Sequence, residues 1–269
     1  MIRTTLAVQP ASSQLHRRSA PAIEIDDDKY LVRFARNTEE LEAVLKLRFE
    51  VFNLELGEGL ESSFRTGRDR DQFDATCHHL MVVDKRTTNT VGTYRIQTIE
   101  MAGGAAGLYS SGEYDLSSLP TDFLHESIEL GRACIAREHR NRQVLFLLWR
   151  GLAQYLVSER KRFLFGCCSL TSQDPVAGRQ VLNYLATHNY LHSTLMVQAR
   201  RGYQCVALDA EPLPPNEVKL PKLFATYLGI GAKVCSAPAL DRSFKTIDFL
   251  VVLDVLELDA RSRRMFFGL

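Results

Sequence analysis

Apolar residues recur along the chain with two periods, which predict an alternating series of strands and helices. Period-two alternation, typical of half-buried strands, occurs at residues 30–35, 79–83, 90–99, 128–135, 162–170, 195–198 and 246–255. Helical spacing begins at Thr38, which is followed by two glutamates, and recurs at residues 144–158, 175–188 and 220–228. Up to residue 198 the predicted order is β-α-β-β-β-α-β-α-β.

Polar stretches set the expected boundaries. Residues 1–28 are polar and end in three consecutive aspartates, so we expect a disordered N-terminal arm. Residues 29–269 predict a single domain, with a C-terminal extension over residues 212–269. The charged stretch 56–76 contains several glycines and favours a mobile loop over a substrate. Residues 101–123 form an insertion between two predicted strands.

Composition places the chain among globular proteins, because 269 residues with 45% hydrophobic content can bury a substantial core. The formal net charge of +1 argues against a nucleic-acid partner. Positive charge is nevertheless concentrated in one segment, which indicates a locally acidic partner. The residues concerned are Arg132, Arg137, Arg140, Arg142 and Arg150.

The six cysteines show no C-x-x-C spacing, and several lie in apolar, strand-like runs. This pattern favours buried thiols in a reducing compartment. No apolar run approaches the roughly 20 residues that a membrane-spanning helix needs. The first residues lack an apolar stretch behind a basic start, so we expect no secretion signal and a cytoplasmic location.

One predicted strand carries an acid. Period-two alternation places Gly131 and Ala133 on the same face as Glu129, so the carboxylate borders a space without bulky side chains. A substrate backbone could lie in that space. The alternative interpretation is an ion pair of Glu129 with Arg132 or Arg95.

The strand, arginine-rich turn and helix at residues 128–158 resemble the Gcn5-related N-acyltransferase (GNAT) fold. This is an α/β fold with a central mixed, mostly antiparallel sheet flanked by helices. Short motifs resemble the L-ornithine N-alpha-acyltransferase family of ornithine-lipid synthesis, whose members are often labelled haemolysin-like. They are LRFEVF at 47–52, DQFD at 71–74, CHHL at 77–80, GTYR at 92–95, ELGR at 129–132, LPKL at 220–223, YL at 227–228, GAKV at 231–234 and DFLV at 248–251.

The resemblance covers about residues 30 to 268 and implies an activity. A long acyl group, 3-hydroxylated or not, would pass from acyl carrier protein to the α-amine of ornithine and give a lyso-ornithine lipid. Other acceptors stay open, namely glycine, lysine, glutamine or a homoserine-lactone precursor. The reason is that acyl-homoserine-lactone synthases and long-chain N-acyl amino-acid synthases show a similar pattern, here Arg48, Phe52, Asp71, Asp74, Arg95, Glu129 and Arg132.

The turn before the central helix contains no glycine. Acetyl-coenzyme A users of this fold normally close a glycine-containing turn on a pyrophosphate. Basic side chains suit the single phosphodiester of a carrier-protein phosphopantetheine better, so we expect an acyl carrier protein thioester as donor rather than acyl-CoA. We expect no bound cofactor or metal. The residues expected at the carrier are Arg137, Arg140, Arg142, Gln143 and Val144, with a solvated turn as the alternative.

An amino-acid ammonium must lose a proton before it attacks a thioester, and a positioned carboxylate contributes about 10²- to 10⁴-fold to such a step. We expect Glu129 to be this base, with His79 as the alternative. The tetrahedral intermediate needs hydrogen-bond donors, which we expect from backbone N–H groups between Cys134 and Ala136.

Charged residues are expected to bracket the acceptor. Arg95 or Arg132 would bind its carboxylate through a bidentate fork, and Asp74 would attract a second ammonium. The complete predicted acceptor site consists of Arg48, Asp71, Asp74, Arg95, Arg132, Cys134 and Ala136.

Two hypotheses of other classes stay open. The haemolysin-like label suggests a membrane-lytic toxin, although the expected lack of a secretion signal and a spanning helix argues against it. A catalytically silent module would bind acylated carrier protein without releasing its thiol. Basic and apolar residues at 261–267 also predict transient contact with the inner membrane surface, unless this tail packs on its own domain.

Overall fold

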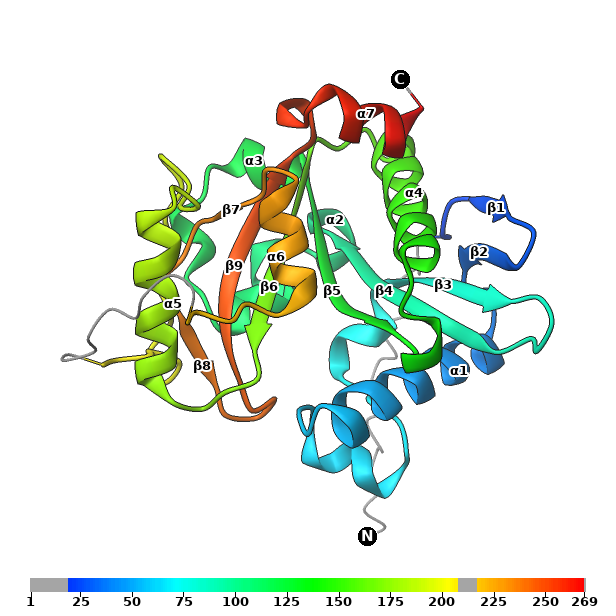
Figure 1. Ribbon diagram of the computed structural model, residues 1–269, viewed down its shortest axis with the longest axis horizontal. Coiled ribbons are helices and arrows are strands. Elements are labelled where there is room, and N and C mark those ends of the chain that lie inside the picture. Colours follow the sequence, from blue (N-terminus) through cyan, green and yellow to red (C-terminus); the bar gives the residue numbers. More distant parts are fainter. Residues whose placement is uncertain (1–18, 208–216, 269) are drawn as a thin grey trace, which may run out of the picture.

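The computed structural model describes residues 19–207 and 217–268. Within these residues one sheet runs in the order β1-β2-β3-β4-β5-β6-β9-β7, with β8 also paired to β9 (Figure 1). Every pairing is antiparallel except β5 with β6. The expected mixed, mostly antiparallel sheet flanked by helices is thereby confirmed.

The strands are β1 Glu24–Asp26, β2 Tyr30–Phe34, β3 His78–Asp84, β4 Thr90–Thr98, β5 Ser127–Ile135, β6 Phe163–Leu170, β7 Lys233–Val234, β8 Ala239–Asp241 and β9 Thr246–Asp254. The α-helices are α1 Thr38–Arg48, α2 Ile99–Ala102, α3 Thr121–His125, α4 Arg142–Ser158, α5 Pro175–Thr187, α6 Lys222–Gly229 and α7 Ala260–Phe267. A π-helical segment, Phe49–Glu55, continues α1.

Helices cover both faces of the sheet (Figure 1). The apolar side of α4 packs on β2, β3 and β4, and the Asn141 side chain caps this helix by accepting from Val144 N (3.0 Å). On the opposite face, α1 and its π-helical continuation pack against β5 through Leu47, Val51 and Cys134. Helices α5 and α6 cover one side of β6 and β9, and the insertion after β4 covers the other. The helices thus leave little sheet surface exposed.

Two local predictions are wrong. The expected arm is not disordered up to residue 28, because alternation puts Ile23 and Ile25 into the core and lets β1 pair with β2; residues 1–18 lie outside the described residues. No strand forms at 195–198, where the pairing is an isolated bridge between Val197 and Ser236. Strand β9, which the sequence predicts at 246–255, pairs along the whole length of β6. The C-terminal segment is therefore part of the sheet.

Strands β5 and β6 separate shortly after they begin. Their parallel pairing runs from Ser127 opposite Phe163 to Glu129 opposite Phe165 and then ends. At the next position Gly166 lies so close to the carbonyl oxygen of Leu130 that a Cβ atom would collide with it. Only glycine lets the two backbones come this close before they diverge. The gap beyond this point becomes the site described below.

The C-terminal tail packs on its own domain. Helix α7 contacts α4, and Phe266 is buried against Trp149 with ring centroids 4.8 Å apart. Arg261, Arg264 and Met265 remain exposed. No helix in the described ranges is both long and apolar enough to cross a bilayer. Contact of this tail with the inner membrane surface remains a prediction.

Substitution Gly166→Ala is expected to destabilise the fold by about 1–3 kcal/mol, because the added methyl group must displace the Leu130 backbone. Denaturant unfolding of both proteins measures the difference. The matched control is Gly229→Ala at the end of α6, where a Cβ meets no atom within 4 Å, and its effect is expected to stay within about 0.5 kcal/mol. Equal stability of the wild type and Gly166→Ala would show that the two strands can separate without glycine.

Candidate active site

A β-bulge shapes the central strand. The register between β4 and β5 shifts between Thr93 and Arg95, and Arg132 on β5 adopts a left-handed backbone conformation with φ of 49°. The bulge breaks the period-two alternation that the sequence predicts. Ala133 consequently packs with the α4 cluster, while Cys134 faces α1. The expectation that Ala133 shares a face with Glu129 is therefore wrong.

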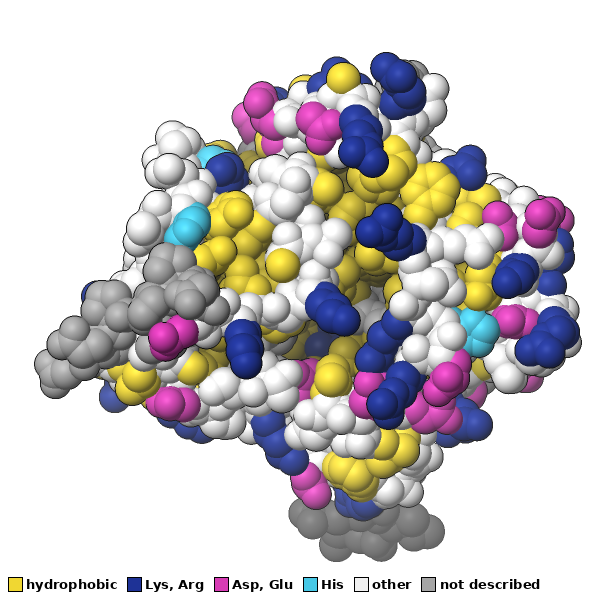
Figure 2. Space-filling view, viewed as in Figure 1, with side chains coloured by type: hydrophobic (Ala, Val, Ile, Leu, Met, Phe, Trp, Pro, Cys, Tyr) yellow, Lys and Arg dark blue, Asp and Glu magenta, His cyan; other side chains and the backbone are white. Residues whose placement is uncertain are grey.

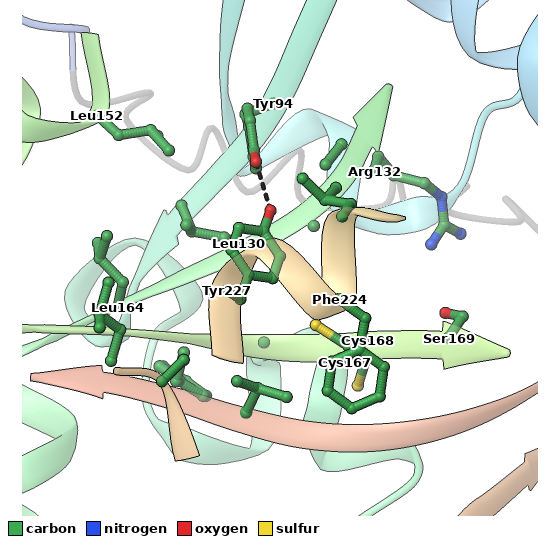
Figure 3. Close-up of a pocket in the computed structure, with 18 of the residues that line it drawn as sticks. Tyr94, Leu130, Arg132, Leu152, Leu164, Cys167, Cys168, Ser169, Phe224 and Tyr227 are labelled. Atoms are coloured by element: carbon green, nitrogen blue, oxygen red, sulfur yellow. Dashed lines mark hydrogen bonds between the residues drawn. The ribbon is translucent and has the colours of Figure 1, made fainter. Parts of the chain in front are cut away.

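The gap between β5 and β6 holds a cavity of about 320 Å³. Figure 3 shows Leu152 and Leu164 at one end and Arg132 and Ser169 at the other. The wall comes from β4, β5, α4, β6, α6, β9, α7 and the segment that follows α1. Its residues include Phe52, Glu58, Tyr94, Tyr109, Leu130, Gly131, Arg132, Ala133, Trp149, Leu152, Leu164, Gly166, Cys167, Ser169, Phe224, Tyr227, Phe244, Asp248, Leu253, Leu258, Phe266 and Phe267.

The cavity is apolar over most of its length and polar at one end. Near its middle the hydroxyl groups of Tyr94 and Tyr227 hydrogen-bond to each other, and Trp149 Nε1 donates to Tyr94 (3.3 Å). Their polar atoms are thus paired with each other, so the rings add apolar surface to the wall. In Figure 2, hydrophobic side chains gather in the hollow between α4 and α6, with Lys and Arg side chains around it.

Six charged side chains form a closed ring beside the polar end. Arg48 donates to Asp69 (2.8 Å) and Asp74 (2.7 Å). Arg95 donates to Asp74 (3.2 Å) and Asp71 (2.6 Å). Arg132 closes the ring on Asp71 (3.1 Å) and Asp69 (3.2 Å). We call this set the Arg–Asp ring; it has no net charge, and its members come from α1, the segment before β3, β4 and β5.

The Arg–Asp ring corrects several predicted roles. Both oxygens of Asp74 are occupied, since Asp71 N also donates to Oδ2 (2.8 Å), so Asp74 is not available to a second ammonium. Arg48 and Arg95 do not line the cavity, whereas Arg132 does. Asp69, which is fully buried, is missing from the sequence prediction. The segment from Asp69 to Asp74 is held in the ring and is not a loose covering loop.

Arg132 connects the ring to the cavity. Its guanidinium lies between two aromatic rings, with centroid distances of 4.9 Å to Tyr109 and 4.2 Å to Phe244. Two aspartates and two ring faces fix this cation in one place. Because it also lines the cavity, it is suited to hold an anionic group of a bound molecule.

Glu129 forms hydrogen bonds with the insertion that follows β4. Its carboxylate accepts from Tyr109 N (2.8 Å), Ser110 N (2.8 Å) and Ser110 Oγ (2.5 Å). Burial raises the pKa of Glu129 despite these hydrogen bonds. The residue is absent from the cavity wall among the described residues. The contacts show a positioning role for Glu129, and its catalytic role stays a prediction.

Three further residues predicted for the site, His79, Cys134 and Ala136, do not line the cavity either. His79 is buried and its Nε2 lies 3.1 Å from Asp74 O, while burial lowers its pKa to about 4. Its imidazole is therefore neutral near pH 7. Burial raises the pKa of Cys134 to about 12, so this thiol is protonated. Ala136 N donates to Val91 O (2.8 Å), so this predicted oxyanion donor is already used.

The arginine-rich turn is only partly open to a partner. Arg140 forms a bidentate ion pair with Glu55 and also donates to Ile135 O (3.0 Å). Gln143 Nε2 donates to Asp27 (2.7 Å), and Val144 is buried with its N–H bound to the Asn141 cap. The remaining two, Arg137 and Arg142, have exposed side chains that form no hydrogen bond or ion pair with any described residue.

Sequence patterns missed the acids at the polar end. Glu58 and Asp248 line the cavity, and Glu113 and Asp241 lie close to Asp248. Burial raises the pKa of Glu58, which accepts a hydrogen bond from Thr171, and the charge of Asp248 raises it further. An acid in a strand or insertion is a weak signal by itself. Of these acids, Asp248 alone lies in one of the family motifs, DFLV at 248–251, and this was the signal that could have identified it.

Comparison with known proteins identifies the family. Residues 47–150 match the family described as acetyltransferase (GNAT) domain. The L-ornithine N(alpha)-acyltransferase of Agrobacterium fabrum is 33% identical over 248 residues, which cover 85% of this chain and 82% of that protein. The enzyme of the same name from Brucella abortus is 32% identical, with 86% of each chain covered. The chain belongs to the L-ornithine Nα-acyltransferase family.

A solved structure agrees with the fold of this L-ornithine Nα-acyltransferase family member. FeeM, an N-acyl amino acid synthase from uncultured soil microbes, superposes with a TM-score of 0.50 at 11% identity and covers 86% of this chain and 94% of its own. The acetyltransferase match contains the whole Arg–Asp ring. By contrast, β6, α6, β9 and α7, which complete the cavity wall, lie outside the match.

The Arg–Asp ring predicts a loss of stability in acid. Neighbouring arginines lower the pKa of Asp71 and Asp74 in spite of their burial. Their stabilising contribution is therefore complete above the unfolded-state pKa of about 3.9 and is lost as the pH falls further toward the lower folded-state values. Denaturant unfolding from about pH 6 to about pH 2 should show this fall.

A substitution in the ring tests the same interaction near neutral pH. Asp74→Asn is expected to cost about 3–5 kcal/mol, because two buried arginines lose part of their counter-charge, and to flatten the acid dependence. The control Glu24→Gln removes an exposed ion pair to Arg36 and should cost less than about 1 kcal/mol. Equal costs would contradict a special role for the buried ring.

Proposed function

We propose that this protein transfers a long fatty acyl group from the phosphopantetheine thioester of an acyl carrier protein to the α-amine of ornithine, giving a lyso-ornithine lipid. The observation that carries the proposal is the cavity between β5 and β6, apolar along its length and charged at one end. Membership of the L-ornithine Nα-acyltransferase family supports ornithine as acceptor.

The apolar part of the cavity suits a fatty acyl chain. Leu152 and Leu164 lie at the end away from Arg132 (Figure 3), and Leu253, Leu258 and Phe266 add further apolar surface to the wall. Each buried methylene contributes about 0.8 kcal/mol, so a long chain gains binding energy that an acetyl group lacks. The thioester carbon would then lie near the polar end, where β5 carries its bulge.

The reaction joins the acceptor nitrogen to the thioester carbonyl carbon and breaks the carbon–sulfur bond. The acceptor ammonium first gives a proton to a base, and the carrier thiol leaves with a proton. Residues Leu130 to Ala133 line the cavity, so we expect the oxyanion donors among their backbone N–H groups rather than between Cys134 and Ala136. Arg132 would hold the acceptor carboxylate.

Glu58 is the carboxylate best placed to act as base. It lines the cavity, and its segment is fixed by hydrogen bonds from Glu58 N to Phe52 O (2.8 Å) and from Gly59 N to Phe244 O (3.0 Å). Its raised pKa suits proton abstraction better than an ordinary carboxylate does. Glu129, the base expected from the sequence, is turned toward Ser110 instead.

Two amide substitutions distinguish the candidate bases. Glu58→Gln is expected to lower kcat about 10²- to 10⁴-fold with little effect on unfolding. Glu129→Gln is expected mainly to destabilise the protein, because a carboxylate that accepts three hydrogen bonds is replaced. Steady-state kinetics and denaturant unfolding of both variants measure this. A stable Glu129→Gln protein with the larger loss of kcat would restore Glu129 as the base.

Arg137 and Arg142 are the basic side chains we expect at an acidic carrier protein. The double substitution Arg137→Glu and Arg142→Glu should raise KM for acyl carrier protein thioesters about tenfold or more and weaken its salt dependence, without affecting a small acyl-pantetheine donor. The control Arg179→Glu, on the exposed side of α5, should change neither KM. An equal effect on both donors would place these arginines outside the carrier interface.

The overall activity is tested by incubating the protein with long-chain acyl carrier protein and a panel of amino acids. Thiol release and mass spectrometry of the products should show N-acyl-ornithine. Turnover of acyl-CoA alone would overturn the proposed donor, and an acyl-amide of another amino acid would overturn the acceptor. Binding of acyl carrier protein without thiol release would favour a silent binding module.

A further inference from the structure

Buried carboxylates without a cation lie next to the polar end of the cavity. Glu113, from the insertion after β4, is 3% exposed, and Asp248 on β9 is 2% exposed. One oxygen of each, together with Cys167 Sγ, lies within 4.8 Å of the others. Glu113 Oε1 and Asp248 Oδ1 have no hydrogen-bond partner. Asp241 is buried close by and adds further negative charge.

This cluster differs from the Arg–Asp ring, in which every aspartate binds two arginines. In the part of the chain that the structure describes, no hydrogen bond or ion pair joins the side chain of Glu113 or Asp248 to Lys, Arg or His. Burial raises the pKa of both groups. Negative charge nearby raises it further, from Asp248 and Asp241 for Glu113 and from Asp241 for Asp248. A cation placed between them would allow both to ionise.

The cluster adjoins the proposed acceptor site through Asp248. Asp248 lines the cavity together with Arg132, Tyr109 and Ser169. The Tyr109 hydroxyl lies 3.5 Å from Asp241 Oδ2, while the Tyr109 ring packs against the Arg132 guanidinium. One aromatic side chain therefore joins the cationic and the anionic parts of this end. A small molecule with an anionic group at one end and a cationic group at the other matches this arrangement.

We infer that Asp248 and Glu113 bind the distal ammonium of the acceptor and thereby select a diamino acid over a neutral amino acid. The inference rests on the proposed function. A primary ammonium carries three N–H donors, and the two unpartnered oxygens accept two of them. The sequence analysis expected Asp74 to bind this second ammonium. We assign that role to Asp248 and Glu113, because both oxygens of Asp74 are already hydrogen-bonded within the Arg–Asp ring.

A divalent metal is the competing occupant, since Glu113, Cys167 and Asp248 could act as ligands. Thiol ligands bind metals as thiolates. Burial and the surrounding carboxylates raise the pKa of Cys167 and oppose that form. Asp248 and Cys167 also line the cavity in which we propose that the acceptor binds, and this favours an organic ammonium.

The test compares ornithine with norleucine, which has the same chain length but a methyl group in place of the distal ammonium. With long-chain acyl carrier protein as donor, the wild type should prefer ornithine in kcat/KM by about 30-fold or more, the effect of an unpaired buried charge. Asp248→Asn and Glu113→Gln should each lower kcat/KM for ornithine by a similar factor and lower it far less for norleucine, so that the preference for ornithine is lost. Activity with norleucine also reports that each variant is folded.

Asp115→Asn is the matched control. It is a carboxylate-to-amide change in the same insertion, at an exposed side chain that accepts from Ser117 N (3.1 Å), and it should alter neither acceptor. A wild type that uses norleucine as well as ornithine would overturn the inference while leaving acyl transfer intact. So would equal losses with both acceptors in both variants, or activity lost to a chelator and restored by one divalent metal. If no amino acid is acylated at all, the proposed function itself fails.

Discussion

The Arg–Asp ring is the interaction on which the rest of the site depends. Three arginines and three aspartates alternate, so each charge has two opposite neighbours and the set is neutral. Removing any one would leave charges buried without compensation, which costs far more than losing an exposed pair. The ring joins α1, the segment before β3, β4 and the bulge of β5, and it thereby fixes the Arg132 side chain at the cavity.

A second constraint is the separation of β5 and β6. Paired strands would fill this space with backbone hydrogen bonds, whereas here Gly166 permits one close approach and the strands then diverge. Helix α6, helix α7 and strand β9 close the gap from the C-terminal part of the chain. The cavity therefore needs segments that lie about a hundred residues apart in the sequence, and it forms only when the whole sheet is complete.

Charge is distributed unequally over the site. In the Arg–Asp ring positive and negative groups cancel, so it can stay rigid without a ligand. The buried carboxyl groups of Glu113 and Asp248, by contrast, have no cation beside them among the described residues, and this arrangement is unfavourable when both are ionised. The Arg–Asp ring, which has no net charge, thus lies beside a cluster with uncompensated negative charge. This arrangement is expected where one part of a site keeps its shape and another part binds a charged substrate.

The sequence by itself determined most elements, because the patterns of apolar residues in α4, β4, β6 and β9 are local properties. It also determined the family through motifs along the chain. It also brought out five of the six ring residues. Only the tertiary structure decided what these residues do. The bulge at Arg132 reverses the faces of the sheet on which Ala133 and Cys134 lie. The insertion after β4 takes up the hydrogen-bonding capacity of Glu129, and the fold brings Glu113 next to Asp248. Such outcomes depend on contacts between distant segments, which no local pattern encodes.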